Sequence, residues 1–147
     1  MEIFLDAEFN GFGGDLISLA LVCEDGREWY EVVEMPAVPH PFAAQHVLPQ
    51  LGKEPIGREC FARSLGDFLT SISQPVVIAD WPDDIRCLCD GLGMFGRGMR
   101  YPLGCTFILL PHQPPEALQM THNALSDARA LRVWYTNRSS FPSVPVG

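Results

Sequence analysis

The chain has 147 residues, of which 47% are hydrophobic and 19% charged, and it carries a net charge of −8. This composition is typical of one globular domain with a sizeable core, and it excludes a disordered chain. The negative charge argues against tight, non-specific binding to nucleic acid. It leaves room for an enzyme that contacts such a partner through metal ions.

The N-terminus has no basic and apolar leader pattern, and no apolar run approaches the length that crosses a membrane. We therefore expect a soluble, cytoplasmic protein with no membrane partner. The five cysteines include no Cys-x-x-Cys pair, so we expect reduced thiols in place of disulfides or a zinc site.

The first predicted strand, residues 2–9, is mostly apolar but carries Asp6 and Glu8 near its end. Residues two apart on a strand point to the same side, so these two carboxylates should lie next to each other. Two neighbouring charges beside a core are costly unless a partner neutralises them, and a divalent cation with oxygen ligands is the usual partner. The alternative is a strand end whose acids face water.

The rest of the chain predicts a mixed sheet with flanking helices. The glycine-rich turn Asn10–Gly14 and the hairpin signal Asp25-Gly26 separate apolar strands, which predicts a three-stranded antiparallel meander. A proline-rich loop over 35–55, with a helical turn near 43–48, precedes alternating helix and strand patterns. The expected elements are strands 2–9, 16–23, 28–34, 75–79 and 105–110, and helices 56–72, 83–92 and 123–137.

This element order is that of a ribonuclease H-like α/β fold, in which helices flank a sheet built from the meander and parallel strands. We expect residues 1–138 to form one such domain. Residues 139–147 are rich in proline and serine and should be a flexible tail.

A second group of acids directly follows the strand 75–79. It comprises Asp80, Asp83 and Asp84, and sheets of this kind tend to bind ligands past the ends of their strands. The alternative is that Asp83 and Asp84 are acids of a first helical turn, where the helix dipole favours negative charge.

A third place of interest is the start of the last helix. His122 and Asp127 lie five residues apart there, within about one and a half turns, so both can face one cleft if the helix begins near His122. The alternatives are a core or capping histidine and a solvated helix face. Together the three places supply an acid pair, a further acid and a His/Asp pair.

The ordered motifs carry a resemblance to a known family. They are Asp-x-Glu, Val-Ile followed by Asp84, and His-x-Ala-x-x-Asp, and they span Asp6 to Asp127. In this order they resemble the DEDDh 3′→5′ exonuclease superfamily, which includes ribonuclease T and oligoribonuclease. The opening residues are similar to the small bacterial exoribonucleases of that superfamily known from mycobacteria.

The resemblance implies roles for individual residues. Its metal-binding carboxylates would be Asp6, Glu8, Asp84 and Asp127, holding two divalent cations, Mg²⁺ or Mn²⁺. His122 would be the general base, because a histidine can take a proton from water near neutral pH. The second motif departs from the family pattern, because Asp83 and Asp80 stand where a Phe and an Asn are usual. Asp84 is the preferred ligand, and Asp80 is the second choice, assisting through water or hydrogen bonds.

The resemblance also implies a substrate and a partner. We expect release of nucleoside 5′-monophosphates from single-stranded RNA 3′ ends, by a homodimer. A DNA exonuclease and a non-catalytic nucleic-acid-binding or scaffold protein are the alternatives. Phe9 and Asn10, directly after the acid pair, are candidate substrate-binding residues, and Phe9 could either stack on the terminal base or pack in the core. Four arginines could contact phosphates or be ordinary surface charges; they are Arg97, Arg100, Arg129 and Arg132.

Overall fold

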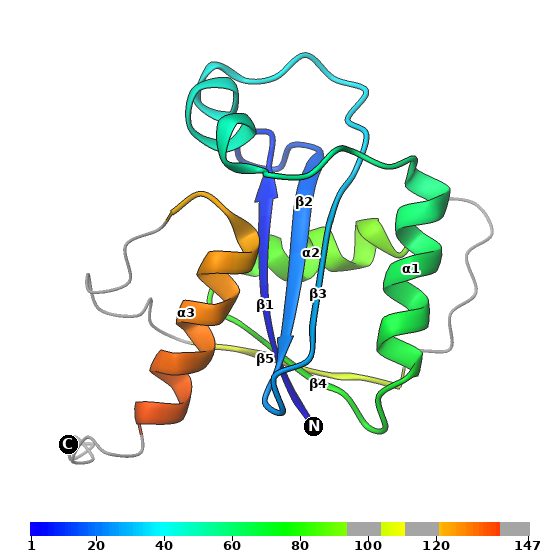
Figure 1. The fold of residues 1–147 in the computed structure, drawn as a ribbon, viewed down its shortest axis with the longest axis vertical. Coiled ribbons are helices and arrows are strands. Elements are labelled where there is room, and N and C mark those ends of the chain that lie inside the picture. The colour runs from blue at the N-terminus through cyan, green and yellow to red at the C-terminus, as the bar shows by residue number, and fades with distance from the viewer. Residues whose placement is uncertain (94–103, 111–120, 139–147) are drawn as a thin grey trace.

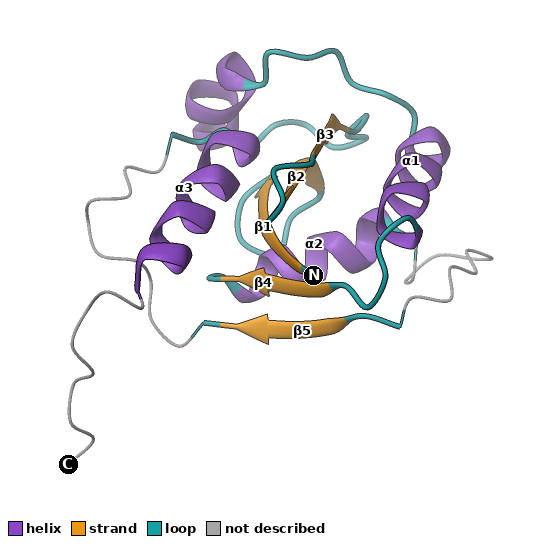
Figure 2. Ribbon diagram, turned by 60° about the horizontal axis from the view of Figure 1, so that its bottom comes forward, coloured by secondary structure: helices purple, strands orange, loops and turns teal. Residues whose placement is uncertain are grey.

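The computed structural model describes residues 1–93, 104–110 and 121–138, and these form a five-stranded mixed sheet with flanking helices. The strands lie in the order β3-β2-β1-β4-β5 (Figures 1 and 2). The fold is therefore the ribonuclease H-like α/β arrangement that the sequence predicts. The elements are β1 (Glu2–Phe9), β2 (Leu16–Cys23), β3 (Glu28–Val32), η1 (Ala43–Val47), η2 (Leu48–Gln50), α1 (Arg58–Thr70), β4 (Val76–Ala79), α2 (Pro82–Gly91), β5 (Thr106–Leu109) and α3 (Ala124–Asn137).

The first three strands form the predicted antiparallel meander, with β2 between β1 and β3. All eight residues of β2 are buried, as expected for a strand covered on both faces. The pairing of β1 with β2 shifts between Glu8 and Phe9, which leaves Ile17 without a partner residue on β1. Such a bulge bends a strand and changes the direction of nearby side chains, and here it falls beside one of the predicted site acids.

The second half of the sheet is parallel. Strand β4 pairs with β1, and β5 pairs with β4, both in parallel. Helix α1 connects β3 to β4, as the long crossover between parallel strands requires. The two sides of the sheet carry different helices: α1 and α2 lie on one side and α3 on the other (Figure 1).

The main core lies between the sheet and helices α1 and α2. Ile3, Leu5 and Ala7 of β1 point into it together with Phe61 of α1 and Leu88 of α2. The other side of β1 faces α3, because Phe4 packs in a cluster with Ile78 and Leu131. Alternation along the strand therefore assigns Asp6 and Glu8, which share the direction of Phe4, to the α3 side.

Helices α1 and α2 contact each other closely at Gly91. A Cβ atom at this position would lie 2.9 Å from the Phe61 ring and 3.2 Å from a methyl group of Leu16. The absence of a side chain at the end of α2 thus allows the two helices to approach.

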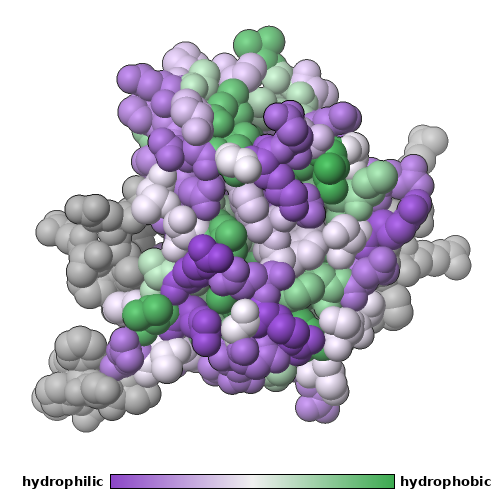
Figure 3. Space-filling view, viewed as in Figure 1, coloured by the Kyte–Doolittle hydropathy of each residue, from purple (hydrophilic) through white to green (hydrophobic). Residues whose placement is uncertain are grey.

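The proline-rich segment, residues 35–55, folds over the end of the meander as a π-helical turn, η1, followed by a 3₁₀ turn, η2. Ala43 and Val47 are buried against Val32. Asn10 anchors the segment at its start, because its amide donates to the Val38 carbonyl at 3.0 Å and accepts from the His40 amide at 2.6 Å. Apolar residues lie among polar ones on the surface of this region (Figure 3).

Several predicted boundaries need correction. Helix α1 covers 58–70 and not 56–72, because Ile56 pairs with Val33 in an isolated parallel bridge. Strand β3 ends at Val32, before that bridge. Helix α2 starts at Pro82, one residue earlier than predicted, since proline is well suited to the first helical position. The tail 139–147 and most of the glycine-rich connection 91–104 lie outside the described residues.

Among the described residues, no helix is both long enough and apolar enough to span a membrane.

A candidate metal centre at the ends of β1 and β4

Asp6 and Glu8 occupy neighbouring positions on the α3 side of β1. Glu8 pairs in register with Ser18 of β2, and Asp6 with Ala20. The Ala20 position packs against Ala124 and Ala128 of α3, so this helix covers the strand where the acids emerge. Glu8 is buried, with 9% of its surface exposed.

Asp80 and Asp84 approach the same place from the next strand. Asp80 directly follows β4, and Asp84 lies in the first turn of α2. The pairing of β4 with β1 extends only as far as Phe4, so the amide of Ala7 needs another partner. It donates to Oδ1 of Asp84 at 3.3 Å. This bond fixes the Asp84 carboxylate beside β1.

Asp127 reaches the site from the first turns of α3. The helix is capped by the side chain of Asn123, which accepts from the Ser126 amide. Oδ1 of Asp127 accepts two bonds from Thr121, from its amide at 2.9 Å and its hydroxyl at 3.0 Å. A further bond of 2.7 Å runs from Asn123 to the Gln50 carbonyl, which joins the start of α3 to the proline-rich segment.

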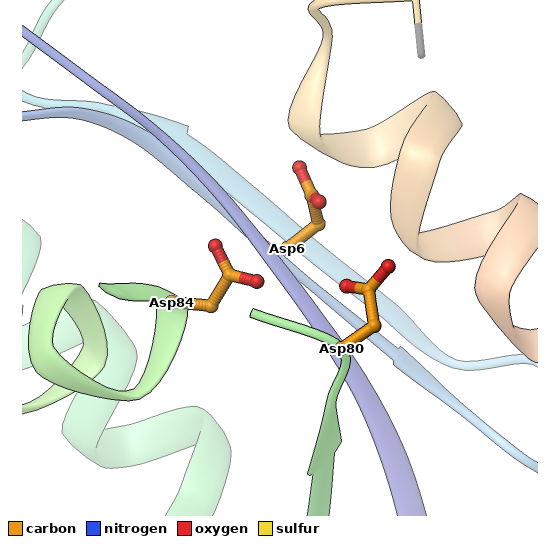
Figure 4. A group of neighbouring side chains, drawn as sticks. All are labelled: Asp6, Asp80 and Asp84. Carbon is orange, nitrogen blue, oxygen red and sulfur yellow. The ribbon is translucent and has the colours of Figure 1, made fainter. Parts of the chain in front are cut away.

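The five acids form two overlapping groups, which we call the carboxylate cluster. In the first group, oxygen atoms of Asp6, Asp80 and Asp84 all lie within 4.8 Å of one another; the same holds for Asp6, Glu8 and Asp127 in the second. Asp6 belongs to both groups. Figure 4 shows the first group, with its three carboxylates gathered from β1, the end of β4 and the start of α2.

The electrostatics of the carboxylate cluster favour a cation. Burial and the neighbouring acids, Asp84 first among them, raise the pKa of Asp6 well above its ordinary value. Burial, followed by the charge of Asp127, raises the pKa of Glu8 to about 8. Burial, followed by the charge of Asp80, raises the pKa of Asp84 to about 8. A divalent cation would remove this repulsion between like charges.

Each group also contains a carboxylate oxygen without a protein partner. Oδ2 of Asp84 and Oδ2 of Asp127 are both buried and form no hydrogen bond with the residues that the structure describes, although buried polar atoms in proteins are normally satisfied. A set of donors made only of carboxylate oxygens suits hard ions such as Mg²⁺ and Mn²⁺. The residues present therefore fit the two divalent cations that the family resemblance implies.

Asp83 takes no part in the carboxylate cluster. Its Oδ1 forms an ion pair with Nε of Arg86 at 2.7 Å, and the same guanidinium donates to the Gly14 carbonyl at 3.0 Å. Of the three acids that follow β4, Asp80 and Asp84 thus lie next to Asp6. Asp83 pairs with Arg86 instead.

His122 lies outside both carboxylate groups. Helix α3 begins at Ala124 and not near His122, whose φ of 56° places it in the left-handed region, before the helix. Its ring packs edge-on against Phe42 at a centroid distance of 5.2 Å, and the His46 ring lies 6.1 Å away. The sequence argument that His122 and Asp127 face one cleft assumes a helix that begins near His122. Because α3 begins after this residue, that assumption does not hold.

The remaining candidate residues have structural partners. Phe9 packs against the main core, and the Arg86 guanidinium lies 5.8 Å from its ring centroid. The Asn10 amide holds the proline-rich segment, as described above. Arg129 forms a bidentate ion pair with Glu28, with bonds of 2.7 and 2.6 Å, and Arg132 donates to the Glu24 carbonyl. Arg97 and Arg100 lie outside the described residues.

No family model matches this sequence, and no curated protein matches it. The roles of the carboxylate cluster are therefore argued from its geometry. Its residues come from the three places that the motifs indicate, and Asp80 belongs to the same group as Asp6 and Asp84.

Two neighbours of His122 have no signal in the sequence. Phe42 and His46 contact the His122 ring from a segment about 80 residues earlier in the chain. The proline-rich segment has no periodic pattern that predicts which of its side chains face the rest of the protein. Phe42, half exposed and beside His122, could be found only from the fold.

Proposed function

We propose that the protein is a metal-dependent 3′→5′ exonuclease that acts on single-stranded RNA ends and releases nucleoside 5′-monophosphates. The observation that carries this proposal is that Asp6 belongs to two carboxylate groups at once. A shared carboxylate between two ion sites is what a hydrolase needs to hold two divalent cations close together. The order of the motifs along the chain, and their resemblance to the DEDDh superfamily, supply the reaction direction and the preference for RNA.

Four carboxylates of the cluster would hold the metal ions. Asp6, Glu8, Asp84 and Asp127 hold the ions, because their oxygens converge and two of these remain unpartnered. When bound, the ions supply an activated water and stabilise the leaving 3′ oxygen. The negative cluster without cations would repel a phosphodiester, so the protein binds its substrate only in the metal-loaded state.

His122 is the proposed general base. It stands just before α3, with Asp127 in the first turns of that helix, and its ring packs against Phe42. A histidine is suited to accept a proton near neutral pH.

The experiment is hydrolysis of single-stranded RNA and of DNA of the same sequence, both labelled at the 5′ end, with Mg²⁺ or Mn²⁺. We expect a ladder that shortens from the 3′ end of RNA and that disappears with EDTA. Asp6→Asn should abolish it, since the shared ligand is lost. The matched control is Asp83→Asn, which removes the acid next to Asp84 in the sequence; this acid lies outside the cluster, and the variant should retain activity.

The same assay separates the alternatives. Faster shortening of DNA would replace RNA by DNA as the substrate. Binding of RNA without any shortening, unchanged in Asp6→Asn, would favour the non-catalytic binding protein and contradict the proposal.

We also propose that the protein works as a cytoplasmic homodimer. In support, β5 is one of the two edge strands of the described sheet, and its Phe107, Ile108 and Leu109 side chains are exposed. Exposed apolar edges of this kind are normally covered. Light scattering on the purified protein tests the dimer, and a mass of one chain at all concentrations would contradict it.

A further inference from the structure

We infer that Asp80 is a fifth metal-binding carboxylate, and that Asp6, Asp80 and Asp84 hold one of the two ions without any ligand from helix α3. The inference rests on the metal pair of the proposed function. It assigns the ions to separate sets of residues: the second ion would belong to Asp6, Glu8 and Asp127.

The geometry places Asp80 among the ligands. Its carboxylate lies with those of Asp6 and Asp84 in Figure 4, and one oxygen from each of the three lies within 4.8 Å of the others. Oxygens that bind one small divalent ion octahedrally, at about 2.1 Å from it, lie about 3 to 4 Å apart. The group therefore needs an inward movement of about 1 Å or less to surround an ion.

A second observation points to a ligand at this place. The Asp84 side chain is 2% exposed, and its Oδ1 accepts from the Ala7 amide. Its Oδ2 is buried and has no hydrogen-bond partner within residues 1–93, 104–110 and 121–138. Figure 4 shows this carboxylate beside those of Asp6 and Asp80. A buried carboxylate oxygen left without a hydrogen bond is costly, and an ion between the three acids would satisfy it.

Capping of helix α2 does not explain Asp80. The N-cap of this helix is Trp81, which makes no side-chain cap bond, and the acids of its first turn are Asp83 and Asp84. Of these, Asp83 is paired with Arg86. Asp80 precedes the cap and lies at the end of β4, where its carboxylate faces the carboxylate cluster.

The charges of the two groups have a consequence for metal loading. Five carboxylates carry up to five negative charges, whereas two divalent ions carry four positive ones. The protein ligands alone thus neutralise both ions, so we expect both to bind without nucleic acid. An enzyme that relied on substrate phosphates to complete its sites would load its second ion only with substrate.

The test is Mn²⁺ binding to the full chain without nucleic acid, followed by calorimetry and by electron paramagnetic resonance. We expect two ions for the wild type. Asp80→Asn should weaken one of them by about tenfold or more and leave the other unchanged. Asp83→Asn is the matched control and should bind both ions as the wild type does. Circular dichroism establishes that each variant is folded, and Asp80→Glu should restore part of the lost affinity.

Equal binding of both ions by Asp80→Asn and the wild type would overturn the inference, as would the failure of the wild type to bind a second ion without nucleic acid. The outcome is separable from that of the proposed function. Two ions bound through Asp80, without any shortening of RNA or DNA, would support this inference and contradict the exonuclease.

Discussion

Removing the charge of Glu8 should stabilise the metal-free protein. Glu8 is buried on β1 beside Asp6 and shares a group with Asp127. Glu8→Gln keeps the size of the side chain and deletes its charge. Without cations, the folded protein must either hold Glu8 protonated or accept a buried charge next to other acids, and both are costly at neutral pH.

The magnitude follows from the pKa of Glu8, which is about 8 in the folded protein against 4.5 for the free side chain. At pH 7 the unfolded chain has lost this proton, whereas the folded protein still holds it. Each pH unit between 4.5 and 7 costs about 1.4 kcal/mol, so folding is disfavoured by about 3 kcal/mol at pH 7. Below pH 4.5 the Glu8 carboxyl is protonated in both states and does not oppose folding. As the pH rises from 4.5 toward 8, the folded protein progressively loses stability.

The assay is urea unfolding with EDTA present, at pH 5, 7 and 8. Glu8→Gln should exceed the wild type by about 3 kcal/mol at pH 7 and by less than about 1 kcal/mol at pH 5. Glu59→Gln, which changes an exposed glutamate paired with Arg63, is the control and should show no such pH-dependent gain. An equal effect of Glu8→Gln at all three pH values would refute the reasoning, because it would mean that Glu8 is solvated.

Three further predictions concern metal binding, the helix contact at Gly91 and the hydrogen bond between Asn10 and His40. Saturating Mg²⁺ or Mn²⁺ should raise the melting temperature of the wild type, by an amount equivalent to about 3 kcal/mol at 100 times Kd; the rise should vanish with EDTA and be smaller in Asp6→Asn. Gly91→Ala should destabilise the protein by about 1–3 kcal/mol in urea unfolding, because its Cβ would lie 2.9 Å from the Phe61 ring; unchanged stability would contradict the close helix contact. Asn10→Ala should speed hydrogen exchange of the His40 amide, which loses its acceptor, and equal exchange rates would show that the bond is absent in solution.

The sequence predicts the fold and most of the carboxylate cluster because the relevant signals are local. Alternating or continuous apolar runs define the strands, and the i, i+2 spacing of Asp6 and Glu8 places them on one side of β1. The acids after β4 are also visible in the sequence. Choosing among them depends on where α2 begins. It begins at Pro82, so that Asp83 and Asp84 lie in its first turn and Asp80 lies before it.

The position of His122 could not be predicted in the same way. The residue adopts a left-handed backbone conformation, which breaks the helical register that the spacing to Asp127 assumes. Its ring neighbours come from the proline-rich segment, and contacts between such distant, aperiodic segments have no local pattern. The same holds for Asn10, whose amide partners Val38 and His40 lie in that segment.

The most direct measurement of the central claim is the identity of the product. Single-stranded RNA with a 3′ hydroxyl would be incubated with the protein and Mg²⁺ in ¹⁸O-labelled water, and the products analysed by mass spectrometry. The account predicts nucleoside 5′-monophosphates that carry one ¹⁸O atom in the phosphate, released by the wild type and by Asp83→Asn but not by Asp6→Asn. Nucleoside 3′-phosphates, or no mononucleotide from the metal-loaded wild type, would contradict it.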